Sequence, residues 1–322
     1  MHWELEKMKT HNFSALPTDS SKIRFTNQFS FIKALAVLLL QLSVFVIHPG
    51  SALAEVKANY QRIISATPSL TEILFALGAG DRVVAVTDFC SYPPEACQLP
   101  SIGGLLNPSV ESWIKLRPDL IVYQGKNSRL ASNARNLKIK TLSYPLDNLD
   151  DIFDAIARLG AILGKNKEAK NLIASIRSKL DFYKQSLKNT RSKSVLLLLG
   201  DSNDPRRDLY AVGKGTFLDQ LLTLAGGENI LPDSLARYPK ITKEFIIKSS
   251  PEVIIEAGPK SNLDPQEQKE RIDAWSKFST IRAVQSQSIF FIGDSYILLP
   301  GPRLVKTVER FGKVIHPGKF SK

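Results

Sequence analysis

The sequence predicts an α/β protein of two similar α/β lobes, with parallel-type sheets flanked by helices and a ligand cleft between the lobes. Three observations lead to this prediction. Short apolar segments alternate with helical patterns in both halves of the 322-residue chain. The stretch "ESWIKLRPDLIVYQG" at 111–125 recurs as "EFIIKSSPEVIIEAG" at 244–258, which is 133 positions later. Residues 149–190 follow a purely helical pattern, which predicts one long backbone helix that joins the lobes.

Residues 1–54 are expected to be a signal peptide. Lys33 precedes an apolar run at 34–47, and the small-residue site "ALA" at 52–54 follows it. The run is short for a membrane-spanning helix, and a retained anchor is the alternative. No cysteine lies near this site, so a lipid-anchored form is not supported. We therefore predict export to the periplasm and cleavage after Ala54.

The N-terminal lobe is assigned to residues 55–148. Its first strand is predicted at 62–65, and a capping box at 69–72 (Ser-Leu-Thr-Glu) is expected to begin a helix that ends at the glycines of "GAG". The later elements are a buried strand in "RVVAV", the helix, turn and strand of the repeat, and a strand in "LKIKTLSYP". Buried strands separated by helices are typical of a parallel sheet.

An apolar stripe runs along the helical linker at 149–190. Its members recur at steps of three and four: Ala169, Leu172, Ile173, Ile176, Leu180, Tyr183 and Leu187. Neither glycine nor proline interrupts residues 166–189, so a continuous helix would span about 36 Å at ~1.5 Å per residue. Such a helix is long enough to join two lobes and to restrict how far they open.

The C-terminal lobe, residues 191–322, repeats the plan of the first. Its expected elements are strands in "SVLLLLG" and "DLYAVG", a helix in "GTFLDQLLTLAGGENI", the second repeat copy, a helix around Trp275, a strand in "SIFFIG" and a closing helix after "GPR". The helix that ends in two glycines corresponds to "LTEILFALGAGD" in the first lobe.

Charge and reactive residues argue against several classes of function. The net charge is +12, but the basic residues are scattered among acids, so no nucleic-acid partner is expected. Three of the four histidines lie in the leader, which leaves His316 and predicts no metal site. No hydrolase, nucleotide-loop or zinc-protease motif occurs, so we predict no enzyme; an exported hydrolase that uses His316 is the distant alternative. Cys90 and Cys97 are candidates for a disulfide, with two free thiols as the alternative.

The loops expected at the carboxyl ends of the strands are rich in aromatic and basic residues. Ligands of α/β sheets bind at this edge. Five aromatic residues could stack on a large flat ligand: Phe89, Tyr92, Tyr210, Tyr238 and Tyr296. Arg206 and Arg207 could pair with acidic groups of such a ligand. For each aromatic residue taken alone, ordinary loop packing is the alternative.

Five segments form a specific set because they occur in one order: "RIISATPSLTEILFALGAGDRVVAVT", "YPPEA…LPSIGG", "VESWIKLRPDLIV", "FLDQLLTLAGGENI" and "PGPRLV". With them, residues 62 to about 317 resemble the cobalamin-type periplasmic binding proteins of ABC importers, the helical-backbone class that also carries siderophores and haem. The resemblance implies a monomeric binding protein without a cofactor. It would deliver a corrinoid, with vitamin B12 as the first choice, to an ABC permease dimer with its cytoplasmic ATPase. A ferric siderophore or haem, each also a small metal chelate, is the alternative ligand.

The resemblance also assigns roles to residues. Each lobe in this family presents a surface glutamate that meets arginines of the permease, and the matching residues are Glu111 and Glu244, the first residues of the two repeat copies. The matching cleft positions are aromatic Phe89 and Tyr238 and acidic Asp294. Leu105 stands where a tryptophan is expected, and Leu298 falls near the position where a basic cleft residue is expected. Arg303 could replace that basic residue or could anchor the last helix.

Overall fold

The computed structural model describes residues 59–104, 108–200, 209–233 and 236–320. Residues 57–322 form one compact unit. The predicted signal peptide lies outside the described residues, as do Leu105, Arg206 and Arg207. Within the described ranges, no helix is both long enough and apolar enough to cross a membrane.

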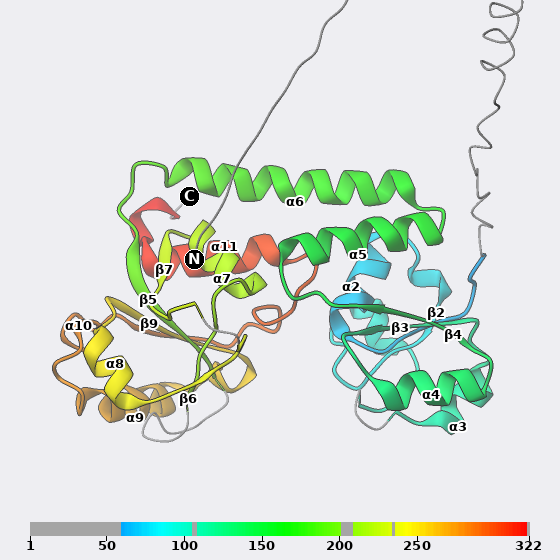
Figure 1. Ribbon diagram of the computed structural model, residues 1–322, viewed down its shortest axis with the longest axis horizontal. Helices are drawn as coiled ribbons and strands as arrows, with labels where there is room; N and C mark the ends of the chain where they lie inside the picture. The colour runs from blue at the N-terminus through cyan, green and yellow to red at the C-terminus, as the bar shows by residue number, and fades with distance from the viewer. Residues whose placement is uncertain (1–58, 105–107, 201–208, 234–235, 321–322) are drawn as a thin grey trace, which may run out of the picture. The chain divides into compact units, whose positions relative to one another are not determined.

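The sheet of the N-terminal lobe is parallel throughout the strands that are described. Its strands are β1 (Ile63–Ser65), β2 (Val83–Ala85), β3 (Leu120–Gln124) and β4 (Lys140–Tyr144), in the order β2-β1-β3-β4 (Figure 1). The helices between them are α2 (Pro68–Ala76), α3 (Val110–Leu116) and α4 (Ser128–Asn136). Parallel neighbours need such crossovers, since a tight hairpin can join only antiparallel strands.

The sheet of the C-terminal lobe has the same topology. Its strands are β5 (Lys193–Leu199), β7 (Gly227–Asn229), β9 (Val253–Ala257) and β10 (Ile289–Ile292), in the order β10-β9-β5-β7. The helices are α7 (Phe217–Leu224), α8 (Lys243–Ser249), α9 (Pro265–Ser276) and α10 (Arg282–Gln285), and β6 (Leu209–Tyr210) pairs with β8 (Lys240–Ile241) as an antiparallel ribbon. Counted along the chain within each lobe, both sheets run 2-1-3-4. The predicted pair of similar lobes is confirmed.

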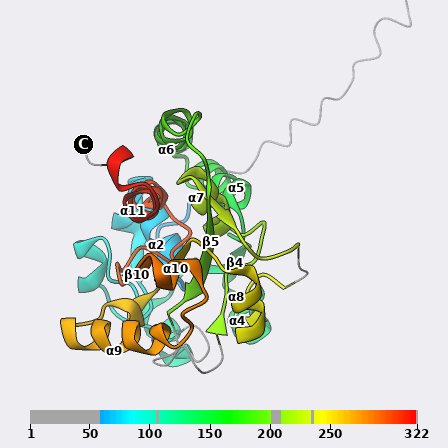
Figure 2. The same cartoon turned by 90° about the vertical axis from the view of Figure 1, so that its left-hand side faces the viewer.

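The predicted backbone helix is confirmed as α6 (Asn166–Ser186), which ends within one turn of the expected residue. It packs against α5 (Leu149–Ile162) and against α11 (Leu304–Ile315), and both views show α6 and α11 side by side (Figures 1 and 2). One hydrophobic core combines side chains of both sheets with those of these three helices. The helix is therefore packed along its length and is not a free linker.

The predicted capping box of α2 is wrong. The helix begins at Pro68, and its N-cap Thr67 makes no side-chain capping bond. Proline suits the first position of a helix because its fixed φ is helical and its missing N–H is not needed there. Glu72, which a capping box would turn back to the helix start, is buried and forms an ion pair with Arg303 at 2.6 Å.

Candidate functional site

The two copies of the repeat begin with the same capping interaction. The hydroxyl oxygen of Ser109 accepts the backbone N–H of Ser112 at 3.2 Å, and that of Thr242 accepts the N–H of Phe245 at 3.3 Å. Ser109 and Thr242 are 133 positions apart, and each satisfies a backbone donor that a helix start leaves unpaired. These caps place the following glutamate in the first turn of α3 and of α8.

The turn after each helix is also the same. Arg117 and Ser250, again 133 apart, adopt left-handed backbone angles with φ of 46° and 41°. The acid two residues later fixes the start of the first strand of its lobe. Asp119 accepts the backbone N–H of Gln61 at 2.7 Å, and Glu252 accepts that of Ser194 at 3.0 Å.

The two predicted docking glutamates are exposed carboxylates. Glu111 has a side chain that is 79% exposed and pairs with Lys115 at 3.1 Å. Glu244 is exposed as well. Its own backbone N–H and the Thr242 hydroxyl donate to the carboxylate and lower its pKa from the ordinary value.

Four of the predicted aromatic residues present part of their rings to solvent. Phe89 is 69% exposed, and Tyr92, Tyr210 and Tyr238 are 41%, 39% and 40% exposed. Phe89 and Tyr92 follow β2, so they lie on the carboxyl-end side of the first sheet. Burial of its hydroxyl, followed by the nearby Asp147 charge, raises the pKa of Tyr238. Most phenylalanine side chains are buried in folded proteins, so an exposed one in such a loop marks a candidate contact for a ligand.

Arg303 lies at the centre of a group that joins the two halves of the chain. Its Nε donates to Glu72 Oε2 at 2.9 Å and its Nη2 to Glu72 Oε1 at 2.6 Å. Its guanidinium also faces the ring of Tyr92 at 4.2 Å and that of Tyr296 at 5.4 Å. Since the Arg303 side chain is only 11% exposed, these contacts favour an anchoring role over ligand binding.

Two more predicted cleft positions have partners within the fold. Asp294 accepts a hydrogen bond from Arg310 Nε of α11 at 3.2 Å. Leu298 lies beside Gly258, where a Cβ would approach its Cδ1 to 3.1 Å. Gly258 follows β9 with φ of 140°, a conformation that side chains rarely adopt. Leu298 therefore packs at the carboxyl end of the C-terminal sheet.

A surface pocket of about 850 Å³ borders the Arg303 group. Its lining includes Glu72, Phe75, Tyr92, Pro93 and Arg303. Tyr92 and Arg303 are the predicted ligand residues among the described residues that line it. The other exposed rings lie elsewhere, so this pocket does not unite the predicted ligand set.

The predicted disulfide is absent, because Cys90 and Cys97 are both free thiols. Cys90 is buried, and its Sγ contacts the hydroxyls of Thr71 and Thr87 at 3.3 and 3.2 Å. The exposed Cys97 instead points its Sγ toward the Cys90 carbonyl oxygen, at 3.8 Å. The two sulfur atoms therefore engage different partners.

His316 lies at the end of α11, where its Nε2 is 3.1 Å from the carbonyl oxygen of Gly226. Burial lowers its pKa below the ordinary histidine value. A neutral ring held by a backbone carbonyl is typical of a packing residue. Over the described ranges, no cluster of three or more His, Cys, Asp and Glu side chains is placed to hold a metal.

Sequence reasoning missed three features of this region. Arg62 and Arg282 each donate to carbonyl groups at the end of a repeat helix. Glu72 was assigned to a cap and not to the Arg303 group. Ile114 and Ile247 are exposed at equivalent positions, 59% and 41% respectively. The repeat itself contains the signal for the isoleucine pair, since the two residues align at the same offset as the glutamates.

Comparison with known proteins agrees with this geometry. The family described as periplasmic binding protein matches residues 63–296. An uncharacterized ABC transporter substrate-binding lipoprotein of Bacillus subtilis, YvrC, is 29% identical over 272 residues, which cover 82% of this chain and 83% of that protein. A vitamin B12-binding protein of Salmonella paratyphi A is 30% identical over 199 residues, 61% of this chain and 72% of that protein.

A solved structure from Staphylococcus epidermidis, of a possible iron-binding (periplasmic solute-binding) protein, is 26% identical with a TM-score of 0.68. The structural alignment covers 80% of this chain and 99% of the Staphylococcus epidermidis chain. The family match alone spans more than half of the sequence. The chain therefore belongs to the periplasmic binding protein family, as a substrate-binding protein of ABC transport.

Proposed function

We propose that this protein captures a corrinoid, with vitamin B12 as the first candidate, and delivers it to an ABC permease. The observation that carries the proposal is the set of partly exposed aromatic rings in both lobes, Phe89 and Tyr92 in one and Tyr210 and Tyr238 in the other. A corrin is large and flat, so rings from two lobes can cover its two faces. The similarity to a vitamin B12-binding protein supports the same ligand class.

A ferric siderophore or haem is the second candidate ligand. One structural neighbour above 25% identity is described as possibly iron-binding. Leu298 falls near the position where a basic residue is expected in a corrinoid binder, and Arg303, which could replace that residue, is held by Glu72. If neither Leu298 nor Arg303 offers a positive charge to the ligand, the arrangement of charges in the cleft differs from that expected for a corrinoid binder. Such a cleft would suit a ligand whose acidic groups are placed differently.

We further propose that the lobes open by only a small hinge movement. The long helix α6 packs on α5 and α11, and all three share one core with both sheets. The Glu72–Arg303 ion pair ties α2 to the start of α11. Removing one partner of such a buried pair costs about 3–5 kcal/mol, so a wide opening that separates the two groups would be costly.

The ligand proposal is tested by titrating the exported, purified protein with cyanocobalamin, hemin and ferric hydroxamates, followed by calorimetry and absorbance. Stoichiometric binding of cyanocobalamin at sub-micromolar affinity is expected. Phe89→Ala and Tyr238→Ala should each weaken it about tenfold, because each removes a stacking surface. Phe182→Ala, at a 65% exposed ring on α6, is the matched control. If the protein binds hemin or a ferric chelate and does not bind cyanocobalamin, that compound replaces the corrinoid as the proposed ligand, and the proposed transport function stands.

The proposed partner is an ABC permease dimer with its ATPase, which docks through Glu111 and Glu244. Charge reversal at both glutamates should abolish uptake of the ligand while ligand affinity stays unchanged. A loss of affinity would instead place these residues in the ligand site. The proposed route is export with cleavage after Ala54, which N-terminal sequencing of the mature protein checks.

A further inference from the structure

Two exposed isoleucines occupy equivalent places in the two repeat copies. Ile114 on α3 is 59% exposed and Ile247 on α8 is 41% exposed. A single exposed apolar residue is ordinary on a protein surface and needs no explanation. These two, however, are 133 positions apart, like the caps and the glutamates of the same helices. The recurrence indicates a shared requirement and not chance.

Each isoleucine lies on the same outer helix face as its glutamate. Ile114 follows Glu111, and Ile247 follows Glu244, by three positions, and side chains at this spacing are neighbours on a helix. The residue just before each isoleucine points the other way: Trp113 is 0% exposed and Ile246 is 2% exposed. Each helix thus buries one anchor and presents an acid and a branched apolar side chain within one turn.

The fold does not need this outer pair. Buried anchors, hydroxyl caps, left-handed turns and the acids that bind strand backbones already hold both copies in place. An exposed β-branched residue gives a short helix no advantage, since lysine, glutamate or alanine has a higher helix propensity. A solvent-facing isoleucine in both copies therefore serves something outside the chain.

We infer that Glu111 with Ile114, and Glu244 with Ile247, are two equivalent two-residue docking elements for a partner that presents two matching sites. Each matching site would offer a cationic side chain beside an apolar recess. This inference rests on the proposed function, because an ABC permease dimer supplies two equivalent faces. It adds the apolar half of the contact and the chemistry of the partner surface.

The glutamate and the isoleucine of each docking element contribute differently to binding. An exposed ion pair adds little affinity and mainly sets orientation and association rate. Burial of the isoleucine against the recess supplies the affinity that the carboxylate lacks. In the free protein, Glu111 pairs with Lys115 while both side chains are more than 70% exposed. Such a pair opens easily, so the carboxylate is available to a partner cation.

Photo-cross-linking in cells tests the surface directly. A photoreactive phenylalanine analogue is placed at position 114 or 247, and cross-linked proteins are identified by mass spectrometry. Positions 182 and 272 are matched controls, because Phe182 and Ile272 are also exposed apolar residues, at 65% and 43%, on α6 and α9. Cross-links to an ABC permease subunit from 114 and 247, and not from 182 or 272, are expected. No permease cross-link, or equal cross-links from all four positions, would overturn the inference.

Substitution then measures the affinity that the isoleucines supply. Ile114→Ser and Ile247→Ser should each raise the protein concentration that half-saturates uptake of radiolabelled cyanocobalamin about 5- to 20-fold. The double variant should combine the two effects, since separate sites add. Ile272→Ser should leave uptake unchanged. The affinity for cyanocobalamin in solution should stay unchanged in every variant, and a variant that loses it would place the isoleucine in the ligand site.

The experiments distinguish a failure of the docking inference from a failure of the proposed function. If the protein binds cyanocobalamin but neither isoleucine affects uptake or cross-links, the inference alone is wrong. If the protein binds no corrinoid, the uptake assay uses whichever of hemin or the ferric chelate it does bind. If it binds none of them and no permease is cross-linked, the proposed function fails as well.

Discussion

The two copies of the helix, turn and strand, at 109–125 and 242–258, keep the same backbone while different side chains hold it. Both have a hydroxyl cap, a left-handed residue after the helix and an acid that binds a neighbouring strand. Both end in a glycine whose N–H donates to the last residue of the next strand: Gly125 to Tyr144 and Gly258 to Ile292. The repeated features are those that the path of the backbone requires.

The copies differ in how the end of each helix is capped. In the first copy, Arg62, which precedes β1, donates through Nη2 to the carbonyl of Leu116 at 2.6 Å. In the second copy, Arg282 of α10 donates through Nε to the carbonyl of Ser250 at 2.8 Å. Arginine thus caps both helices, but it comes from unrelated parts of the chain. The fold therefore requires the hydrogen bond to the carbonyl, and it does not require a particular position for the donor.

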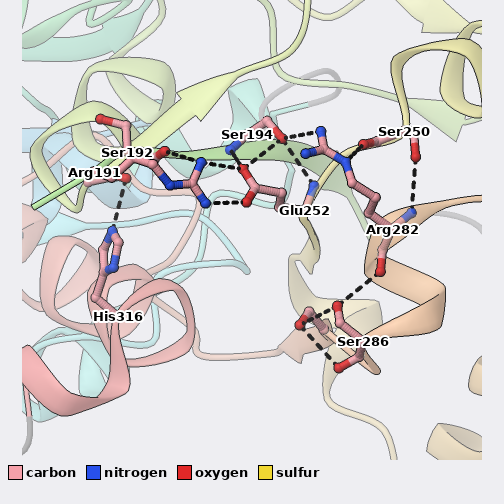
Figure 3. A network of polar contacts seen from close by, with 10 residues as sticks. Arg191, Ser192, Ser194, Ser250, Glu252, Arg282, Ser286 and His316 are labelled. Carbon is pink, nitrogen blue, oxygen red and sulfur yellow. Dashed lines mark hydrogen bonds and ion pairs between the residues drawn. The ribbon is translucent and has the colours of Figure 1, made fainter.

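The second copy also carries an ion pair at its acid. Arg191 forms an ion pair with Glu252, and the Glu252 carboxylate also accepts a hydrogen bond from the backbone N–H of Ser194 (Figure 3). Arg282 donates a hydrogen bond to the Ser194 hydroxyl. The network lies where β5 and β9 begin. The hydrogen bond from Arg191 is the first cause of a pKa of about 2 for Glu252. The stability of the C-terminal copy therefore depends on pH in the acid range through the Glu252 carboxylate.

The largest expected difference between the copies lies in their buried anchors. Trp113→Ala should destabilise the protein by about 3–5 kcal/mol, because it removes a fully buried indole and leaves a cavity. Ile246→Ala removes a smaller side chain, and we expect about 2–3 kcal/mol. Chemical denaturation of both variants measures the difference. Equal losses would show that the two copies are packed alike despite the different anchor sizes.

Much of this architecture follows from sequence because it depends on local patterns. The apolar stripe of α6 and the repeat predict the helix and the paired lobes, since periodicity and burial coincide there. The helix α4 was not predicted, because its sequence is mostly polar and only Leu130 and Ala134 are buried on it. Boundaries near the repeat were predictable because proline and glycine mark them in both copies.

Long-range pairs account for what the sequence could not reveal. Glu72 and Arg303 meet across 231 residues, and the local spacing around Glu72 resembled a capping box instead. The spacing of Cys90 and Cys97 allowed a bridge, but Thr71 and Thr87 engage the Cys90 sulfur. Glu72 and Thr71 thus meet their partners across 231 and 19 residues, and a local sequence pattern does not show such contacts.

The second-largest effect is expected in the pH dependence of stability, through Glu252 of the second copy. The pKa of Glu252 is lowered to about 2, so its contribution to stability is complete above an ordinary glutamate pKa of 4.5 and is lost as the pH falls from there through about 2. Glu252→Gln should remove about 1–2 kcal/mol at pH 7, after screening by solvent, and flatten the fall in stability over that window. Urea denaturation between pH 7 and pH 2 measures it, with exposed Glu228→Gln as the control. An unchanged slope would show that the network is not a source of acid sensitivity.

The two helix-capping arginines should matter less and about equally. Arg62→Ala and Arg282→Ala each remove hydrogen bonds to exposed carbonyl groups, which water can replace, so we expect a loss of about 1 kcal/mol for each. Arg282→Ala also removes the hydrogen bond to the exposed Ser194 hydroxyl, so its loss should be slightly the larger of the two. Thermal unfolding of both variants provides the comparison. A much larger loss in one copy would mean that its arginine stabilises the fold through more than these exposed hydrogen bonds.

The smallest effect on stability is expected at the residues that we assign to docking. Glu111→Gln and Glu244→Gln should leave the unfolding midpoint unchanged within experimental scatter, because both carboxylates are exposed and carry no buried contact. Together they should still reduce ligand uptake, since the orienting charges are gone. If either variant unfolds early, that glutamate supports its helix through the dipole at the helix start, and its recurrence reflects folding. If the variants keep their stability but take up less ligand, the two glutamates serve docking, whereas the caps, turns and strand-binding acids of the same repeat serve folding.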